Sequence, residues 1–177
     1  MTTYAALLRA VNVGGRKLPM ADLRSMLEKA GFEDVATYVQ SGNVVLRSRK
    51  GAAGVETAVE KLIASEFGLE TRVMVRTHGE LEAIVDGNPF PGEAEADGRK
   101  VHVVFLDDAP GAEALGRVDP DRSPGDSFEL SGRDLYLHLP DGAGRTKLTL
   151  DYLERRLGVA GTGRNWNTVV KLLELTA

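Results

Sequence analysis

The chain has 177 residues, of which 42% are hydrophobic and 27% are charged, and its formal net charge is −4 at pH 7. This composition is ordinary for a soluble globular protein and allows one large domain or two small ones. The negative total disfavours a generic polyanion binder, and the lack of cysteine excludes disulfides and thiolate chemistry, which fits the cytoplasm.

The first half of the chain predicts the element order β-α-β-β-α-β. The predicted elements are a strand over Tyr4–Val13, a helix that starts at Pro19 and stops at Gly31, strands over Val35–Gln40 and Asn43–Ser48, a helix over Val55–Phe67 and a strand over Arg72–Thr77. The first strand is apolar on both faces, which is typical of a central strand. This order is that of the ferredoxin-like arrangement, so we assign residues 1–78 to an N-terminal ferredoxin-like α+β subdomain.

The second half repeats this order of elements. Residues 79–98 are predicted to be a connecting helix and a linker rich in Pro, Gly and acidic residues. The elements predicted beyond it are a strand over Lys100–Asp107, a short helix over Ala112–Val118, a hairpin of Ser127–Ser131 and Asp134–Leu139, a helix over Leu148–Leu157, a strand over Val159–Arg164 and a final helix from Trp166. Residues 99–177 thus form a C-terminal α+β subdomain, with the final helix expected to pack back on the N-terminal half. The fold class is α+β: two ferredoxin-like plait halves in tandem with an additional C-terminal helix.

Charge is unevenly distributed along the chain. Residues 1–78 carry 11 Lys and Arg against 8 Asp and Glu, residues 79–144 carry 5 against 15, and residues 145–177 carry 6 against 3. If the two basic ends meet in the fold, they form a positive patch on an acidic protein. The alternative is that these charges serve only solubility. The apolar run Tyr4–Val11 is interrupted by Arg9 and is too short to span a membrane.

One polar stretch ends the first strand. It contains Asn12, Gly14, Gly15, Arg16 and Lys17, and Arg9 lies just before it. Two glycines let the backbone approach a ligand, and the N-terminus of the following helix favours an anion. The stretch is not a Walker P-loop, and a Gly-Gly pair also forms simple turns, so both interpretations stay open.

Two further polar stretches are candidates for ligand binding. The first surrounds a turn, and the second opens the last helix and has Lys147 upstream of it. Their candidate residues are Gln40, Ser41 and Asn43 in the first, and Arg164, Asn165, Trp166 and Asn167 in the second. Asn165 or Asn167 also suits a helix cap, and helical spacing favours the tryptophan as a core residue over a base-stacking one.

Catalytic and metal sites are not predicted. Ser41 lacks a G-x-S-x-G elbow and a nearby histidine. His78, His102 and His138 are single and far apart, and the Asp119–Asp126 segment lacks the spacing of a calcium loop. We therefore expect neither a metal nor a cofactor, and the residues leave open whether the protein is an enzyme.

Four segments together resemble a known family. They are Leu-Arg-Ala-Val-Asn-Val-Gly-Gly at 8–15, Met20 to Leu23, Thr-Tyr-Val-Gln-Ser-Gly-Asn-Val at 37–44 and Arg-Asn-Trp-Asn-Thr-Val at 164–169. This combination resembles the bacterial domain-of-unknown-function 1697 (DUF1697) family, from about Tyr4 to the C-terminus. The resemblance implies a two-lobed α+β protein with plait-like halves. It implies no activity, so no catalytic residue is carried over.

The function expected from these observations is binding of a phosphate-bearing ligand, a nucleotide or single-stranded nucleic acid, by a cytoplasmic protein. Arg9 with Arg16 or Lys17 would meet phosphate, Gln40 and Asn43 would bond a polar edge, and Arg164 would complete the site. A metal-independent transferase or hydrolase acting on a small phosphorylated compound is an alternative. A self-associating module, such as a homodimer, is another.

Overall fold

The computed structural model describes residues 1–9, 17–39 and 42–177. The chain divides into two compact units, the first formed by Met1–Glu82 with Leu172–Ala177 and the second by Ala83–Lys171. Each unit contains a four-stranded antiparallel sheet, and the fold class is α+β, as predicted. Within the described residues, none of the helices has the length and apolarity needed to cross a membrane.

The first unit has the predicted order of elements. They are β1 Thr2–Leu8, α1 Met20–Lys29, β2 Glu33–Tyr38, β3 Asn43–Ser48, α2 Ala52–Phe67 and β4 Val73–Thr77. The strands lie in the order β2-β3-β1-β4, so β1 is central, consistent with a ferredoxin-like half. The predicted strand over Tyr4–Val13 is observed from Thr2 to Leu8, and residues 10–13 lie outside the described part of the chain.

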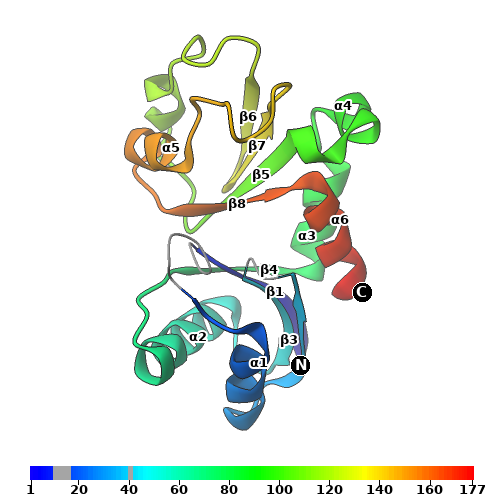
Figure 1. Ribbon diagram of the computed structural model, residues 1–177, viewed down its shortest axis with the longest axis vertical. Helices are drawn as coiled ribbons and strands as arrows, with labels where there is room; N and C mark the ends of the chain where they lie inside the picture. Colours follow the sequence, from blue (N-terminus) through cyan, green and yellow to red (C-terminus); the bar gives the residue numbers. More distant parts are fainter. Residues whose placement is uncertain (10–16, 40–41) are drawn as a thin grey trace. The chain divides into compact units, whose positions relative to one another are not determined.

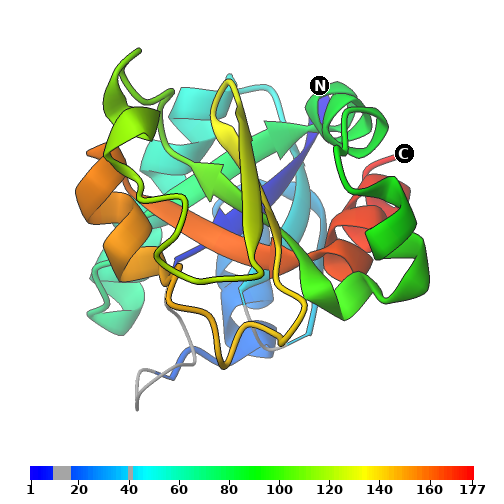
Figure 2. The same ribbon diagram turned by 90° about the horizontal axis from the view of Figure 1, so that it is seen from above.

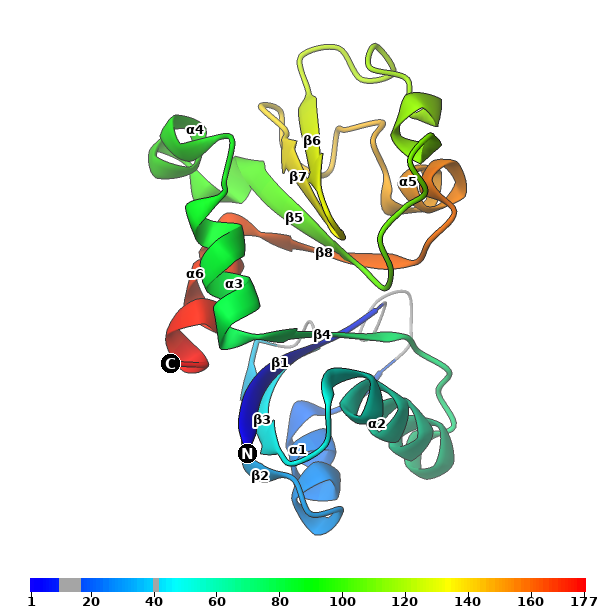
Figure 3. The ribbon, with the colours of Figure 1, turned by 180° about the vertical axis from the view of Figure 1, so that it is seen from behind.

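Both helices of the first unit cover one face of its sheet, as Figures 1 and 3 show. Alternate residues of β1, from Tyr4 to Leu8, pack there against the buried face of α1. Gly68 ends α2 in the left-handed conformation, with φ of 64°, which glycine adopts without strain. Two carboxylates of α2 also bond edge strand β4: Glu60 accepts from the Val73 amide (3.0 Å) and Glu56 from the Val75 amide (3.1 Å).

The second unit repeats the sheet with a different cover. Its elements are the end of α3 His78–Asp86, α4 Pro91–Ala96, the 3₁₀ turn η1 Gly98–Lys100, β5 Val101–Leu106, the 3₁₀ turn η2 Ala114–Arg117, β6 Ser127–Ser131, β7 Asp134–His138, α5 Leu150–Leu157, β8 Gly161–Asn165 and the start of α6 Trp166–Leu175. The strands lie in the order β6-β7-β5-β8, and the β6–β7 hairpin is the yellow ribbon of Figure 2.

Two predictions in the second half need correction. The stretch predicted as a linker contains α4, because Pro91 is preorganised for the first helical turn and Glu93 is the acid favoured there. The short helix predicted over Ala112–Val118 is only η2, which is consistent with Gly111 and Gly116 disfavouring an extended α-helix. The apolar face of the sheet still buries its alternate residues against α5 and η2.

The last helix, α6, ends in the first unit. The Thr176 hydroxyl donates to the Leu172 carbonyl (2.9 Å) and lies 3.0 Å from Nδ1 of His78. Its N-terminus follows β8 directly, so the predicted order of final strand and final helix is confirmed.

Candidate functional site

The C-terminal end of the central strand β1 meets two other chain segments at one end of the first sheet. The Leu8 amide donates to the Gly42 carbonyl (2.9 Å), and Asn43 pairs with Leu7 in the strand register. The Arg9 amide donates to the Arg72 carbonyl (2.9 Å), at the start of β4. Within the first unit, Arg9 and Asn43 therefore lie at the same end of the sheet, where the first two polar stretches were predicted.

The candidate residues of the first two polar stretches differ in exposure where the structure describes them. Asn43 is fully buried, and its Nδ2 donates to the Tyr38 carbonyl (3.0 Å), which ties the start of β3 to the end of β2. Arg9 is half-buried and Lys17 is exposed. The other candidates of these two stretches, Asn12, Gly14, Gly15, Arg16, Gln40 and Ser41, lie outside the described residues.

The C-terminal polar stretch has structural contacts in the second unit. Arg164 is 8% exposed, and its Nη1 donates to the Thr162 hydroxyl (2.7 Å) and to the Gly163 carbonyl (2.8 Å). Burial lowers the pKa of Arg164 to about 10. The Asn165 side-chain oxygen accepts from the Thr168 amide (3.0 Å), which is the helix-capping role that the sequence allowed.

The remaining residues of that stretch are Trp166 and Asn167. Trp166 is half-buried, and Asn167 is exposed. The Asn167 amide packs so closely on Gly98 that a Cβ at residue 98 would collide with it. The stretch therefore holds β8, α6 and η1 together, which is a contribution to the fold that does not depend on a ligand.

A pocket of about 300 Å³ in the second unit gathers three arginines. Arg155 and Arg156 project from the last turn of α5, Arg122 comes from the loop before β6, and Tyr152 completes the lining. We call these four residues the arginine pocket. The Arg122 guanidinium carbon lies 3.9 Å from the centre of the Tyr152 ring, and that of Arg156 lies 5.3 Å from it. One aromatic ring thus holds two cations close together.

Backbone and side-chain hydrogen bonds position the arginine pocket. Arg122 Nε donates to the Lys147 carbonyl (2.9 Å), and the Tyr152 hydroxyl accepts from the Asp119 amide (3.0 Å). Arg155 pairs with Asp151 one helical turn earlier (2.8 Å). Lys147, a residue predicted for the site, is thus adjacent in the fold to a cluster that the sequence did not indicate.

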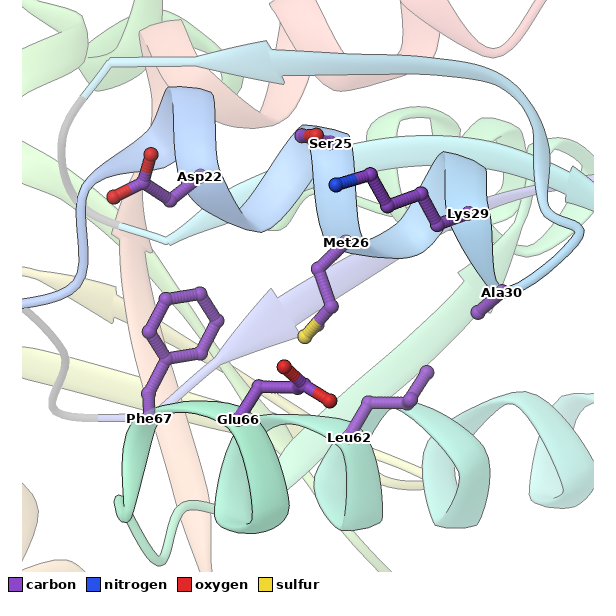
Figure 4. Close-up of a pocket in the computed structure, with 8 residues that line it drawn as sticks. All are labelled: Asp22, Ser25, Met26, Lys29, Ala30, Leu62, Glu66 and Phe67. Atoms are coloured by element: carbon purple, nitrogen blue, oxygen red, sulfur yellow. The ribbon is translucent and has the colours of Figure 1, made fainter.

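Two other pockets have mixed charge. A groove of about 420 Å³ between α1 and α2 is lined by Asp22, Lys29 and Glu66 with apolar Met26 and Phe67 among others, and Figure 4 shows the methionine reaching towards α2. A second, of about 440 Å³, contains the cations Arg99, Lys100 and Arg145 but also two carboxylates. One of these, Asp97, is bonded by Arg99, which lowers its pKa to about 2.

The arginine pocket is therefore the most cationic of the three, because no carboxylate lines it. In the part of the chain that the structure describes, no three His, Asp or Glu side chains are grouped so as to hold a metal ion. The helical part of the pocket could have been predicted from the sequence, since Tyr152, Arg155 and Arg156 have the i, i+3, i+4 spacing of one helix face. Arg122 is 30 residues away from Tyr152 in the chain and had no such signal.

The protein is thus an α+β protein of two similar halves with an additional C-terminal helix. Its second half contains a basic pocket. The chain belongs to the DUF1697 family: the family model, described as "Protein of unknown function", matches residues 1–136.

Among solved structures, the chain is similar to the conserved bacterial protein SP0830 from Streptococcus pneumoniae, with a TM-score of 0.79 and 22% identity over 99% of each chain. At this identity the similarity shows a shared fold. The search of the curated proteins found no match.

Proposed function

We propose that this protein binds a phosphate-bearing ligand, a nucleotide or a single-stranded nucleic acid, and that the arginine pocket holds the phosphate. The observation that supports this is the presence of three guanidinium groups in one pocket of about 300 Å³ without a lining carboxylate. Arginine presents its donors in a planar fork that matches phosphate oxygens, and such charge-assisted pairs are stronger than neutral hydrogen bonds.

The three arginines differ in the partners that their guanidinium groups already have. Arg155 has Asp151 as a partner, whereas Arg156 forms no ion pair among the described residues, and Arg122 uses only Nε on a backbone carbonyl. The terminal nitrogens of Arg122 and Arg156 are the natural contacts for a phosphate. Because Arg122 lies over the Tyr152 ring, that face of the ring is occupied by a cation instead of a base.

The corner at the end of β1 is the second element of the proposal. Arg9 lies there with Asn43, and Lys17 follows Arg9 in the chain after the glycines Gly14 and Gly15. A single-stranded nucleic acid has several phosphates, so this corner is a separate candidate contact for a phosphate, within the first unit. The net charge of −4 argues for a ligand of few phosphates over strong nonspecific binding.

Binding of pyrophosphate, ATP and a fluorescein-labelled deoxythymidine oligonucleotide, measured by calorimetry and fluorescence anisotropy, tests the proposal. We expect the double variant R122Q/R156Q to weaken binding at least tenfold, since each lost charge-assisted bond contributes about 1.5–3 kcal/mol. The control is R117Q, which removes the same charge from η2 outside the pocket and should change affinity less than twofold.

Arg122 also bonds a backbone carbonyl, so circular dichroism must show that the double variant is folded. The exposed Arg156 provides a second variant, R156Q, with a smaller loss expected. If no probe binds, or if R122Q/R156Q and R117Q behave alike, the proposal is wrong. Selective binding of the oligonucleotide with a steep salt dependence would identify nucleic acid as the ligand, and tight ATP binding would identify a nucleotide.

A further inference from the structure

Strand β6 forms one edge of the second sheet, in the hairpin drawn yellow in Figure 2. Two printed bonds show which side of its neighbour β7 faces β5. The Leu139 amide donates to the Lys100 carbonyl (2.7 Å), and the Leu106 amide donates to the Arg133 carbonyl (2.9 Å). Because the direction of the backbone groups alternates along an antiparallel strand, the odd-numbered residues of β7 bond β5 and its even-numbered residues bond β6.

The register of the hairpin transfers this alternation to β6. The even-numbered residues of β7 pair with Ser127, Glu129 and Ser131, so the backbone groups of these three residues are used within the hairpin. The amides and carbonyls of Phe128 and Leu130 therefore point away from β7. They form no hydrogen bond to any other segment in the part of the chain that the structure describes.

The other edge strands have their outward groups occupied or their pairing interrupted. In β4, two outward amides donate to carboxylates of α2. In β8, the outward Gly161 amide donates to Oε2 of Glu154 (2.9 Å). In β2, the register shifts between Glu33 and Ala36. Such devices prevent an edge strand from pairing further, and the regular β6 has none of them among the described residues.

The two faces of β6 present different side chains. Phe128 and Leu130 are half-buried and pack on the core that α5 covers. Glu129 is exposed on the opposite face and has no ion-pair partner among the described residues. Asp134 of β7 lies diagonally across from it on that face. A strand added beside β6 would thus meet an apolar side chain, a negative charge and a second apolar side chain.

We propose that β6 binds an extended peptide segment of a partner protein, which joins the four-stranded sheet as an antiparallel strand and places a Lys or Arg opposite Glu129. Backbone bonds to Phe128 and Leu130 hold the added strand, which is the mode of β-strand addition. The peptide residues opposite Phe128 and Leu130 are apolar, because they extend the same face of the sheet.

Charge argues for such a peptide over a second copy of this chain. Two β6 strands that use all the outward groups of Phe128 and Leu130 would pair antiparallel about Glu129. That register places the two Glu129 carboxylates directly opposite each other, and like charges in this arrangement are destabilising.

Blocked, fluorescein-labelled peptides with the core Thr-Val-Lys-Val-Thr or Thr-Val-Glu-Val-Thr test this inference by fluorescence anisotropy on the full chain. The Lys peptide should bind about fivefold more tightly than the Glu peptide, and E129K should reverse that preference. E113K makes the same change of charge at an exposed position outside β6 and should retain the preference. N-methylation of both valines removes the amides that face β6 and should weaken binding about tenfold, whereas N-methylation of the lysine should weaken it less than about threefold.

Hydrogen exchange of the unmodified protein, followed by NMR, gives an independent readout. In the free protein the amides of Phe128 and Leu130 should exchange faster than that of Glu129, which is bonded within the hairpin. Saturation with the Lys peptide should slow the first two at least fivefold and leave the third unchanged.

The inference is wrong if the Lys peptide does not bind at millimolar concentration, if the two N-methylated peptides bind alike, or if E129K keeps the original preference. It is also wrong if the chain forms a dimer in sedimentation that protects Phe128 and Leu130 without peptide, because a second copy would then occupy the edge. None of these measurements involves the arginine pocket, so failure of this inference and failure of the phosphate proposal are distinguishable.

Discussion

The two units share an order of strands but differ in what covers the sheet. In the first unit, α1 and α2 have 10 and 16 residues and pack over one face. In the second unit, α5 has 8 residues, and a four-residue 3₁₀ turn takes the place of the first helix. Irregular chain, including residues 140–149, covers the remaining part of that face.

This difference shows that the order of strands does not determine how densely a sheet is covered. Two helices bring rows of side chains at regular spacing onto the first sheet, and residues such as Leu23 and Ile63 become fully buried. Loops bring side chains at irregular spacing, and beneath them a pocket of about 250 Å³ remains, lined by His102, Leu137 and Leu153 among others. We call it the histidine pocket. The pocket of the second unit is thus bordered by the sheet itself, whereas the groove of the first unit lies between α1 and α2.

Truncating one core side chain in each unit should have the largest effect and tests the comparison directly. We expect I63A to cost about 4 kcal/mol, because well-packed surroundings cannot collapse into the cavity. We expect L153A to cost about 2 kcal/mol, because this leucine lines an existing pocket and residues 140–149 can adjust. Hydrogen exchange of the amides of each unit measures the two costs separately.

An equal or larger cost for L153A would show that the second core is as tightly packed as the first. The comparison would then have to rest on helix length alone. Ala64 follows Ile63 in α2 and is exposed. A64G is therefore a control for helix propensity and should lower the free energy of unfolding by about 1 kcal/mol.

Most of the strands and of the longer helices followed from sequence patterns. Alternation identified the hairpins, and helical spacing identified α1, α2 and α5. The patterns could not separate a helix from a 3₁₀ turn around Ala114, where glycines flank a short apolar run. They also missed α4, because a six-residue helix has too few turns to show a period.

The candidate sites were less predictable than the fold. A helix cap at Asn165 or Asn167 was predicted from position alone, and the structure shows Asn165 in that role. Arg164 was predicted to bind a ligand, but its guanidinium bonds the Thr162 hydroxyl and the Gly163 carbonyl. Those contacts depend on the direction of a buried side chain, which the sequence does not show. The arginine pocket depends on a loop residue, Arg122, meeting a helix, and nothing local in the sequence determines that contact.

The two glycines of β8 provide a second, intermediate test of packing in the second unit. A Cβ at Gly161 would lie 2.9 Å from side-chain carbons of Leu106 and Val104 and 3.2 Å from the Phe105 carbonyl oxygen. We expect G161A to cost about 1–3 kcal/mol, since backbone and core side chains must shift. The matched variant G163A has room and should change stability by less than about 0.5 kcal/mol.

Urea denaturation of both variants measures this difference. If G161A is tolerated as well as G163A, then the cover of the second sheet is loose on both sides of β8, not only at the histidine pocket. If G163A is the more costly variant, the space next to Val104 is smaller than its 3.9 Å contact indicates.

The smallest expected effect is a dependence of stability on mild acid, specific to the second unit. Burial lowers the pKa of His102 from its ordinary value of 6.5, and no other titratable side chain lines the histidine pocket. Above pH 6.5 the ring is neutral in both folded and unfolded chains, so it contributes no pH dependence. As the pH falls below 6.5, the unfolded chain takes up the proton first, and the folded state loses stability.

We expect the free energy of unfolding to fall by less than about 1 kcal/mol between pH 7 and pH 5.5, because His102 is only half-buried and one proton changes it by at most about 1.4 kcal/mol per pH unit. H102L should remove this slope, whereas H138Q, a substitution in the same sheet outside the pocket, should retain it. Hydrogen exchange across this pH range, corrected for the intrinsic rates, assigns the loss to one unit.

A slope that persists in H102L would mean that another group takes up the proton. A slope of equal size in the amides of both units would remove the contrast between a sheet covered by helices and one covered partly by loops.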